Sequence, residues 1–155
     1  MRRATPEDAP AVAALCGQLG YPTTAAGLQP RLEDLLARPD HAVFVAQAGS
    51  AVVGWVHAFA SHVLEAGSMA EVGGLVVADN QRGRGIGRLL IEQVEAWACD
   101  QGLPVVYLRS NTVRREAHRF YQRLGYCLIK SQYAFRKEVP TTRSTAGGGQ
   151  SSSAG

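Results

Sequence analysis

The sequence predicts an α/β fold with a mixed, mostly antiparallel sheet flanked by helices, in the order β-α-α-β-β-β-α-β-α-β. Three apolar segments follow one another between residues 42 and 77 with turn or loop residues between them, as in antiparallel strands. A long segment with apolar residues at helical spacing comes next, and a short apolar segment follows it. This last pair indicates a strand–helix–strand crossover, which together with the antiparallel strands makes a mixed sheet.

The first forty residues predict one short strand and two helices. Residues 2–4 can form an edge strand. Thr5 is typical of a helix N-cap, because a proline and two acidic residues follow it. The first helix is therefore expected over about 6–18, where a glycine then ends it. The second helix is expected over 25–37, because leucines recur there on one face and a proline follows.

Three strands are expected next, over 42–48, 52–61 and 69–77, with a turn after the first and a loose loop after the second. The third strand contains the pair Gly73-Gly74. Glycine inside a strand has no side chain to pack and often marks a bulge or the close approach of a ligand or another backbone. We therefore expect a bulge in this strand.

The second half of the chain predicts alternating helices and strands. A strong helix is expected over about 85–101, a buried strand over 105–109 and a short helix over 116–124. Residues 127–138 are then expected to form one or two closing strands. We expect one domain over 1–139, followed by a Ser/Thr/Gly-rich tail over 140–155 that is disordered because it cannot bury a core.

Composition narrows the class of protein. Hydrophobic residues make up 46% of the 155 residues, which suits a packed core, but the apolar runs are far shorter than a membrane span requires. The N-terminus has no apolar segment typical of a signal peptide. The chain has only three cysteines, and they are widely spaced; with no metal-ligand spacing elsewhere we expect no metal site and a cytoplasmic protein.

Positive charge gathers in one stretch. Residues 82–123 contain eight arginines and four acidic residues, a balance of +4, whereas the whole chain carries +3. Such a stretch suits an anionic partner such as a nucleotide or coenzyme, and it can equally be a solvated arginine face. We do not expect nucleic acid as the partner, because few aromatic residues are interleaved with these arginines.

The most informative segment is a glycine-rich turn, residues 82–88, between a strand and a long helix. Its glycines let the backbone approach a ligand closely, and the free N–H groups at the start of the helix favour an anion. A P-loop would require Gly-Lys-Ser/Thr, and a dinucleotide fingerprint would require glycine at position 88, where Arg88 stands. What remains is Arg-x-x-Gly-x-Gly over 82–87, which physically suits a pyrophosphate.

This signature resembles the acyl-CoA-binding motif of the GNAT superfamily of N-acetyltransferases. A tyrosine followed by Leu-Gly-Tyr, over 121–126, matches a second feature of that superfamily, and the resemblance covers about residues 2–138. It implies the GNAT-type acyl-CoA N-acyltransferase fold and acetyl-CoA as co-substrate. It also implies transfer of an acetyl group to a primary amine by direct attack in a ternary complex.

The resemblance also implies which residues bind the coenzyme. Leu75, Val76 and Val77 match the strand that pairs with the pantetheine arm, and the N–H of Leu75 would polarise the thioester carbonyl. The pyrophosphate loop matches Arg82, Gly83, Arg84, Gly85, Ile86, Gly87 and Arg88. Many relatives carry asparagine seven residues before the tyrosine; here Arg114 stands at that position, and the nearest candidate for coenzyme contact is Asn111.

Two residues are candidates for acid–base catalysis by the same resemblance. Tyr121 matches the tyrosine that protonates the departing thiolate, and Glu71 matches a glutamate that acts as general base in some members. A base is needed because an ammonium group has a pKa of about 10 and cannot attack a thioester. The alternative readings are a solvated carboxylate for Glu71, a core residue for Tyr121, and structural roles for His57 and His62.

The acceptor cannot be read from any motif in the sequence. We expect a small-molecule amine rather than a protein, and a homodimer is expected only because relatives often dimerise. The alternative functions are a non-catalytic acyl-CoA sensor and a nucleic-acid-binding module that uses the arginine-rich stretch. Consumption of the thioester in the presence of amines separates the enzyme from the sensor.

Overall fold

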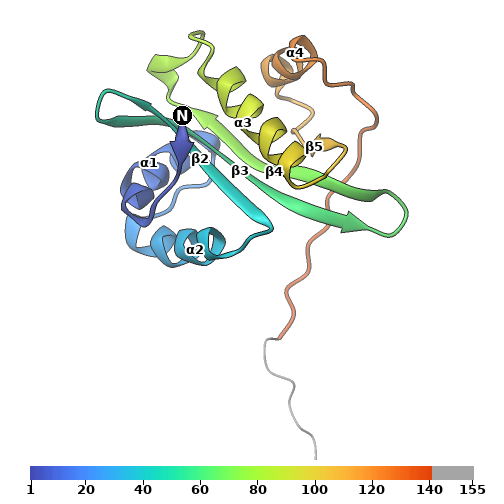
Figure 1. The fold of residues 1–155 in the computed structure, drawn as a ribbon, viewed down its shortest axis with the longest axis horizontal. Coiled ribbons are helices and arrows are strands. Elements are labelled where there is room, and N and C mark those ends of the chain that lie inside the picture. Colours follow the sequence, from blue (N-terminus) through green and yellow to red (C-terminus); the bar gives the residue numbers. More distant parts are fainter. Residues whose placement is uncertain (141–155) are drawn as a thin grey trace, which may run out of the picture.

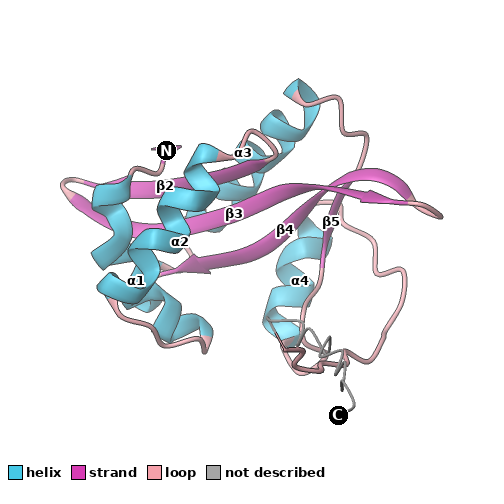
Figure 2. Cartoon of the chain, turned by 90° about the horizontal axis from the view of Figure 1, so that it is seen from below, coloured by secondary structure: helices cyan, strands magenta, loops and turns pink. Residues whose placement is uncertain are grey.

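The computed structural model describes residues 1–140, in which a five-stranded sheet has helices on both faces (Figure 1; Figure 2). The strands are β1 (Arg2–Arg3), β2 (His41–Ala48), β3 (Ala51–Val63), β4 (Gly67–Val77) and β5 (Val106–Leu108). The helices are α1 (Ala9–Leu19), α2 (Ala25–Ala37), α3 (Ile86–Asp100) and α4 (Arg115–Arg123), with the 3-10 turns η1 (Pro6–Asp8) and η2 (Asp79–Gln81).

The strands lie in the order β1-β2-β3-β4-β5. Neighbours are antiparallel except β4 and β5, which are parallel because α3 carries the chain back between them. The predicted mixed, mostly antiparallel sheet is therefore confirmed. No helix within residues 1–140 is both long and apolar enough to cross a membrane.

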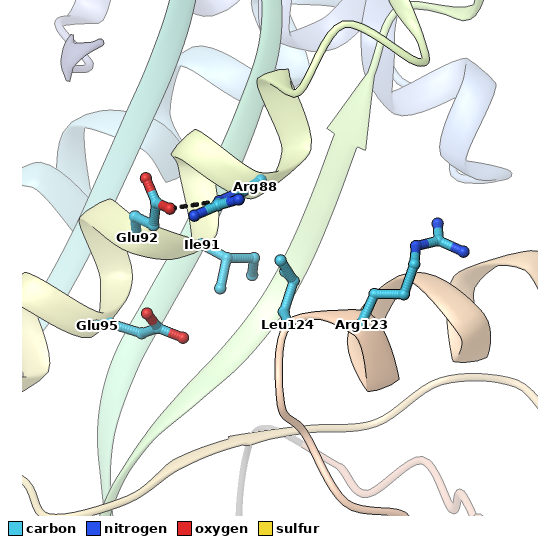
Figure 3. Close-up of a pocket in the computed structure, with 6 residues that line it drawn as sticks. All are labelled: Arg88, Ile91, Glu92, Glu95, Arg123 and Leu124. Atoms are coloured by element: carbon cyan, nitrogen blue, oxygen red, sulfur yellow. Dashed lines mark hydrogen bonds and ion pairs between the residues drawn. The ribbon is translucent and has the colours of Figure 1, made fainter.

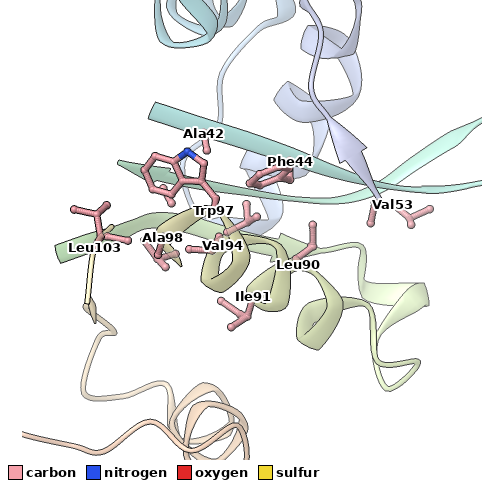
Figure 4. Packing of buried hydrophobic residues seen from close by; sticks show 14 residues of the cluster. Ala42, Phe44, Val53, Leu90, Ile91, Val94, Trp97, Ala98 and Leu103 are labelled. Atoms are coloured by element: carbon pink, nitrogen blue, oxygen red, sulfur yellow. The ribbon is translucent and has the colours of Figure 1, made fainter. Parts of the chain in front are cut away.

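The sheet separates two apolar clusters, because successive residues of a strand point to opposite faces. Val43, Val45 and Trp55 face α1 and α2 on one side. Ala42, Phe44 and Val56 face α3 on the other side. Figure 4 shows the second cluster, to which α3 contributes Leu90, Ile91, Val94, Trp97 and Ala98. This packing fixes the start of α3 at the end of β4, where the functional site lies.

Most predicted elements are present within one or two residues; the first helix, the loop at 62–68 and the closing strands over 127–138 differ. The first helix begins as the 3-10 turn η1 before α1. The loop expected at 62–68 is mostly strand, since β3 and β4 continue to Val63 and from Gly67 as a long hairpin. The expected bulge is confirmed: His57 pairs with Gly74 and Ala58 with Val72, which leaves Gly73 as the extra residue.

The prediction of closing strands over 127–138 is wrong. The structure assigns no strand to residues 127–140. Alternating apolar residues form a strand only where they can pair with a sheet edge. Here the chain runs past the short strand β5 without pairing, and its apolar side chains stay exposed: Leu128, Ile129, Tyr133 and Phe135. The predicted tail lies outside the described residues, apart from Pro140.

The anchoring of α3 can be tested at two adjacent leucines. Leu90 is fully buried against the sheet, whereas Leu89 is 46% exposed. Leu90→Ala leaves a cavity in the core, so we expect the free energy of unfolding to fall by about 2–5 kcal/mol. Leu89→Ala is the matched control and should change it by about 0.5 kcal/mol at most. Urea unfolding followed by circular dichroism measures both, and equal losses would contradict this packing.

Candidate active site

The glycine-rich turn places a row of free backbone N–H groups at the start of α3. Gly83 and Gly85 have φ angles of 76° and 78°, a left-handed conformation that other residues rarely adopt. Among residues 1–140, no backbone carbonyl accepts a hydrogen bond from the N–H groups of residues 83–88, and Gly85 supplies no side-chain cap. With the positive end of the helix dipole behind them, these groups can hold an anion.

The arginines of the turn add positive charge and are engaged only in weak surface pairs. Arg82 pairs with Asp79 at 2.7 Å, and Arg88 pairs with Glu92 at 2.7 Å. All four side chains are largely exposed. Exposed ion pairs contribute about 0–1 kcal/mol, so an incoming diphosphate can recruit either guanidinium at little cost.

The turn forms one wall of a cleft of about 860 Å³. The end of α1, the last residues of β4 and the start of α4 form the other walls. The cleft brings together most of the residues singled out from the sequence: Leu75, Val76, Val77, Arg82, Gly83, Gly85, Ile86, Gly87, Arg88 and Tyr121. Arg84, Asn111 and Glu71 are not among its lining residues.

A second, smaller cleft lies between α3 and α4 (Figure 3). It measures about 240 Å³ and shares Arg88 and Arg123 with the larger cleft. In Figure 3, Arg88 is turned toward Glu92, with which it forms its ion pair. Because Glu92 and Glu95 offset its two arginines, this groove lacks the positive balance of the turn.

The strand β4 leaves its neighbour β5 halfway along its length. β5 pairs with Ala70, Glu71 and Val72 and with no later residue of β4. Residues 73–77 therefore have β3 on one side only, and their backbone groups on the other side are free within the described chain. The N–H groups at this edge border the cleft, and a carbonyl oxygen lying there can be polarised.

The two glycines of the bulge make room for side chains of β3. A Cβ on Gly73 would lie 2.9 Å from Nδ1 of His57, and a Cβ on Gly74 would lie 2.9 Å from the indole ring of Trp55. Such contacts are too short for any side chain larger than hydrogen. Glycine at both positions is thus required by packing, which explains the pair noted in the sequence.

Tyr121 lies on α4 at the inner wall of the cleft. Its ring packs edge-on against Phe120 and Tyr126, with centroids 5.1 and 6.0 Å away. Burial raises the pKa of the Tyr121 phenol, while Arg114 acts in the opposite direction. The group therefore keeps its proton at neutral pH and can donate it.

Glu71 lies on β4, buried to 9% exposure, and forms an ion pair with Arg109 just beyond β5. It sits on the face of the sheet opposite α3, next to the point where β4 and β5 separate. Its carboxylate is thus already engaged by a guanidinium. A ligand that reaches this pair meets the carboxylate of Glu71 beside the guanidinium of Arg109.

Asn111 and Arg114 shape the loop that leads into α4. Asn111 Oδ1 accepts a hydrogen bond from the N–H of Val113 at 3.1 Å. Arg114 donates to the carbonyl oxygen of Leu19 at 3.1 Å and so links α4 to the end of α1 across the cleft. On the same side, Gln18 accepts from the N–H of Asp79 at 3.0 Å.

Comparison with known proteins assigns the family. The model of the Acetyltransferase (GNAT) family matches residues 13–126. The chain belongs to the GNAT family. An aminoalkylphosphonate N-acetyltransferase of Salmonella typhimurium is 33% identical to this GNAT chain over 145 residues, 90% of each protein. An uncharacterised N-acetyltransferase of Bacillus subtilis, YhdJ, is 29% identical over 110 residues, 70% of this chain and 76% of that protein.

Solved structures share the GNAT fold. A putative acetyltransferase from Agrobacterium tumefaciens matches with a TM-score of 0.78 and 24% identity, over 88% of this chain and 98% of that one. An aminoglycoside N-acetyltransferase crystallised with CoA matches with a TM-score of 0.80 and 20% identity, over 89% and 93% of the two chains. The GNAT-type fold expected from the sequence is confirmed.

Sequence reasoning missed the walls of the cleft that come from α1 and from the loop before α4. Gln18, Leu19 and Val113 line it, together with Phe120 and Arg123. Nothing in their local sequence indicates this, because Leu19 and Arg114 are 95 residues apart and meet only in the folded chain. A match to the complete GNAT fold is the signal that could have found them.

The left-handed turn can be tested with two glycine-to-alanine changes. Gly85 has a φ of +78°, whereas Gly17 lies in α1 with open space around it and no positive φ. Gly85→Ala forces a strained backbone, so we expect a loss of about 1–2 kcal/mol in the free energy of unfolding. Gly17→Ala, the control, should gain about 0.5–1 kcal/mol. Chemical denaturation measures both; a stable Gly85→Ala variant would contradict the turn geometry.

Proposed function

We propose that this GNAT protein transfers an acetyl group from acetyl-CoA to the amine of a small molecule, with both substrates bound at once. The observation that carries this proposal is the row of free N–H groups at residues 83–88, at one end of a cleft bordered by the free edge of β4. The first feature suits a diphosphate, and the second suits a thioester carbonyl.

The coenzyme is proposed to lie along the cleft from the turn to Tyr121. The backbone of residues 75–77 would pair with the pantetheine arm, and residues 82–88, including Arg84, would bind the pyrophosphate through their N–H groups. We propose that Asn111 contributes by holding the loop that precedes α4. A structural neighbour crystallised with CoA supports this choice of co-substrate.

The chemistry proposed for the site needs three aids. The amine must lose a proton, the oxyanion formed by its attack must be stabilised, and the departing thiolate must be protonated. We propose the N–H of Leu75 for the oxyanion and the Tyr121 phenol for the thiolate. Holding amine and thioester side by side would supply much of the remaining rate.

The acceptor is proposed to carry an anionic group besides its amine. Glu71 and Arg109 stand together beside the point where β4 and β5 separate, and we propose that the acceptor approaches there. The pair offers a carboxylate for an ammonium and a guanidinium for an anion. The relative named as an aminoalkylphosphonate N-acetyltransferase supports this acceptor class. We infer that Glu71, first considered as the base, binds and orients the amine.

The role of Tyr121 can be tested with a neighbouring tyrosine as control. Tyr121→Phe removes the proton donor, so we expect turnover at pH 7 to fall by about 100-fold, while the affinity for CoA stays unchanged. Tyr126→Phe removes a hydroxyl that bonds to Glu95 instead, and it should keep turnover within about 3-fold. Release of free thiol from acetyl-CoA measures turnover, and calorimetry measures CoA binding.

Two outcomes of this experiment would count against the proposal. If the Tyr121→Phe variant turns over as fast as the wild type, the phenol takes no part in the reaction. CoA binding without release of thiol across a panel of amines would instead identify a sensor, the alternative considered from the sequence.

The acceptor class can be tested with 2-aminoethylphosphonate and propylamine. Arg109→Gln should raise KM for the phosphonate by about 10-fold and leave KM for propylamine unchanged, because only the phosphonate has an anion to bind. Arg136→Gln, which changes an exposed arginine paired with Glu138, is the control and should alter neither KM. Equal effects of Arg109→Gln on both amines would contradict an anion-binding role.

A further inference from the structure

Two histidines form a hydrogen-bonded pair on the face of the sheet opposite α3. His41 lies on β2 and His57 on β3, and the Nδ1 atom of His41 is 2.9 Å from the Nε2 atom of His57. Their ring planes are nearly parallel, at 8°, and the Phe59 ring packs against both. The pair is part-buried, so each ring is held in one orientation.

The free nitrogen of His57 points to the bulge in β4. Its Nδ1 atom lies 2.9 Å from the position that a Cβ on Gly73 would occupy. Gly73 is the first residue of β4 that has no partner on β5, and Leu75 is two residues further along. An amine that reaches a carbonyl at Leu75 from this face of the sheet would pass close to this nitrogen.

We propose, on the basis of the function proposed above, that His57 is the general base of the reaction and that His41 positions its ring and carries the proton away. A hydrogen bond between two imidazoles requires one donor and one acceptor. If His57 donates through Nε2, its Nδ1 keeps a free lone pair on the side of the bulge. Glu71 is less suited to this task because Arg109 already occupies its carboxylate.

The proton balance of the step is complete. As the amine nitrogen bonds to the acetyl carbon, its proton passes to Nδ1 of His57, and the Nε2 proton of His57 passes to Nδ1 of His41. His41 then releases its own Nε2 proton toward Asp40, whose carboxylate is 3.9 Å away, and to water. The carbon–sulfur bond breaks, the thiolate takes the proton of Tyr121, and the phenolate regains a proton from water. An acceptor that arrives as an ammonium gives its extra proton to water before the attack.

The surroundings favour a neutral His57 that passes its proton on. Burial, and after it the neighbouring His41, lowers the pKa of His57 to about 4, so the ring is uncharged at pH 7. The charged groups near the two histidines include Asp40, which lies beside His41 and is paired with Arg38, and the pair of Glu71 with Arg109. The helices α1 and α2 contribute apolar side chains to the cluster on this face. Because its pKa is lowered, His57 readily gives up a proton that it takes from the amine.

Replacement of His57 by a smaller residue allows the missing base to be supplied from solution. His57→Ala should lower kcat by about 100-fold at pH 7, with 2-aminoethylphosphonate or propylamine as acceptor, and leave CoA affinity unchanged. Added imidazole should restore at least about 10-fold of the lost rate, and substituted imidazoles should restore more as their basicity rises. His62→Ala is the control: His62 lies further along β3, bonded to Ser68 Oγ at 2.8 Å, and its removal should change neither rate nor rescue.

An unchanged kcat in His57→Ala, or a loss that imidazole does not restore, would overturn the proposal. Should this variant fail to fold, nitrogen NMR of the wild-type histidines gives the answer directly. We expect His57 to be protonated at Nε2 and bare at Nδ1 at pH 7, and a proton at Nδ1 would overturn the proposal. A wild-type protein that acetylates neither amine would count against the proposed function, whereas an active wild type with an equally active His57→Ala counts against His57 alone.

Discussion

The separation of β4 from β5 after Val72 is the constraint on which the site depends. A strand inside a sheet uses its N–H and C=O groups on both sides and has none left for a ligand. In this chain Gly73 adds one residue to β4 relative to β3, and β4 continues to Val77 without a partner on the β5 side. That free edge borders the cleft, so the fold itself supplies polar backbone groups where a ligand can lie.

The second end of the cleft depends on how α3 is held. Its buried side chains fix the helix against the sheet, and its first turn therefore stays at the end of β4. Free N–H groups at a helix start are ordinarily satisfied by a capping side chain. Here glycine stands at the cap and leaves them open. The coenzyme end and the reacting end of the cleft are thus both made of backbone, on two elements that pack on each other.

Features made by residues close together in the sequence could be predicted, and features made by residues far apart in the sequence could not. The turn at 82–88 and the glycines of the bulge are local, and their positions were predicted correctly. The wall formed by Leu19 and Arg114 joins residues 95 apart, and no periodicity reports such a contact. The strand prediction for 127–138 is wrong because the alternating apolar residues there satisfy only the local pattern of a strand. Pairing also requires a free strand edge elsewhere in the fold, and no strand within residues 1–140 pairs with this segment.

The coenzyme end and the acceptor end of the proposed site differ in the same way, in local against long-range contacts. The groups proposed to bind the coenzyme come mostly from one continuous stretch, residues 75–88, joined by Tyr121 and, through its loop, by Asn111. A single change in that stretch affects a backbone shape that any acyl-CoA needs. The groups assigned to the acceptor are side chains from separate strands: His41 meets His57 across 16 residues, and Glu71 meets Arg109 across 38. Neither pair includes a residue of the turn. A fold organised in this way can keep the same acetyl donor while its amine acceptor changes. The turn therefore identifies the family, whereas the acceptor has to be inferred from side-chain pairs that only the folded chain brings together.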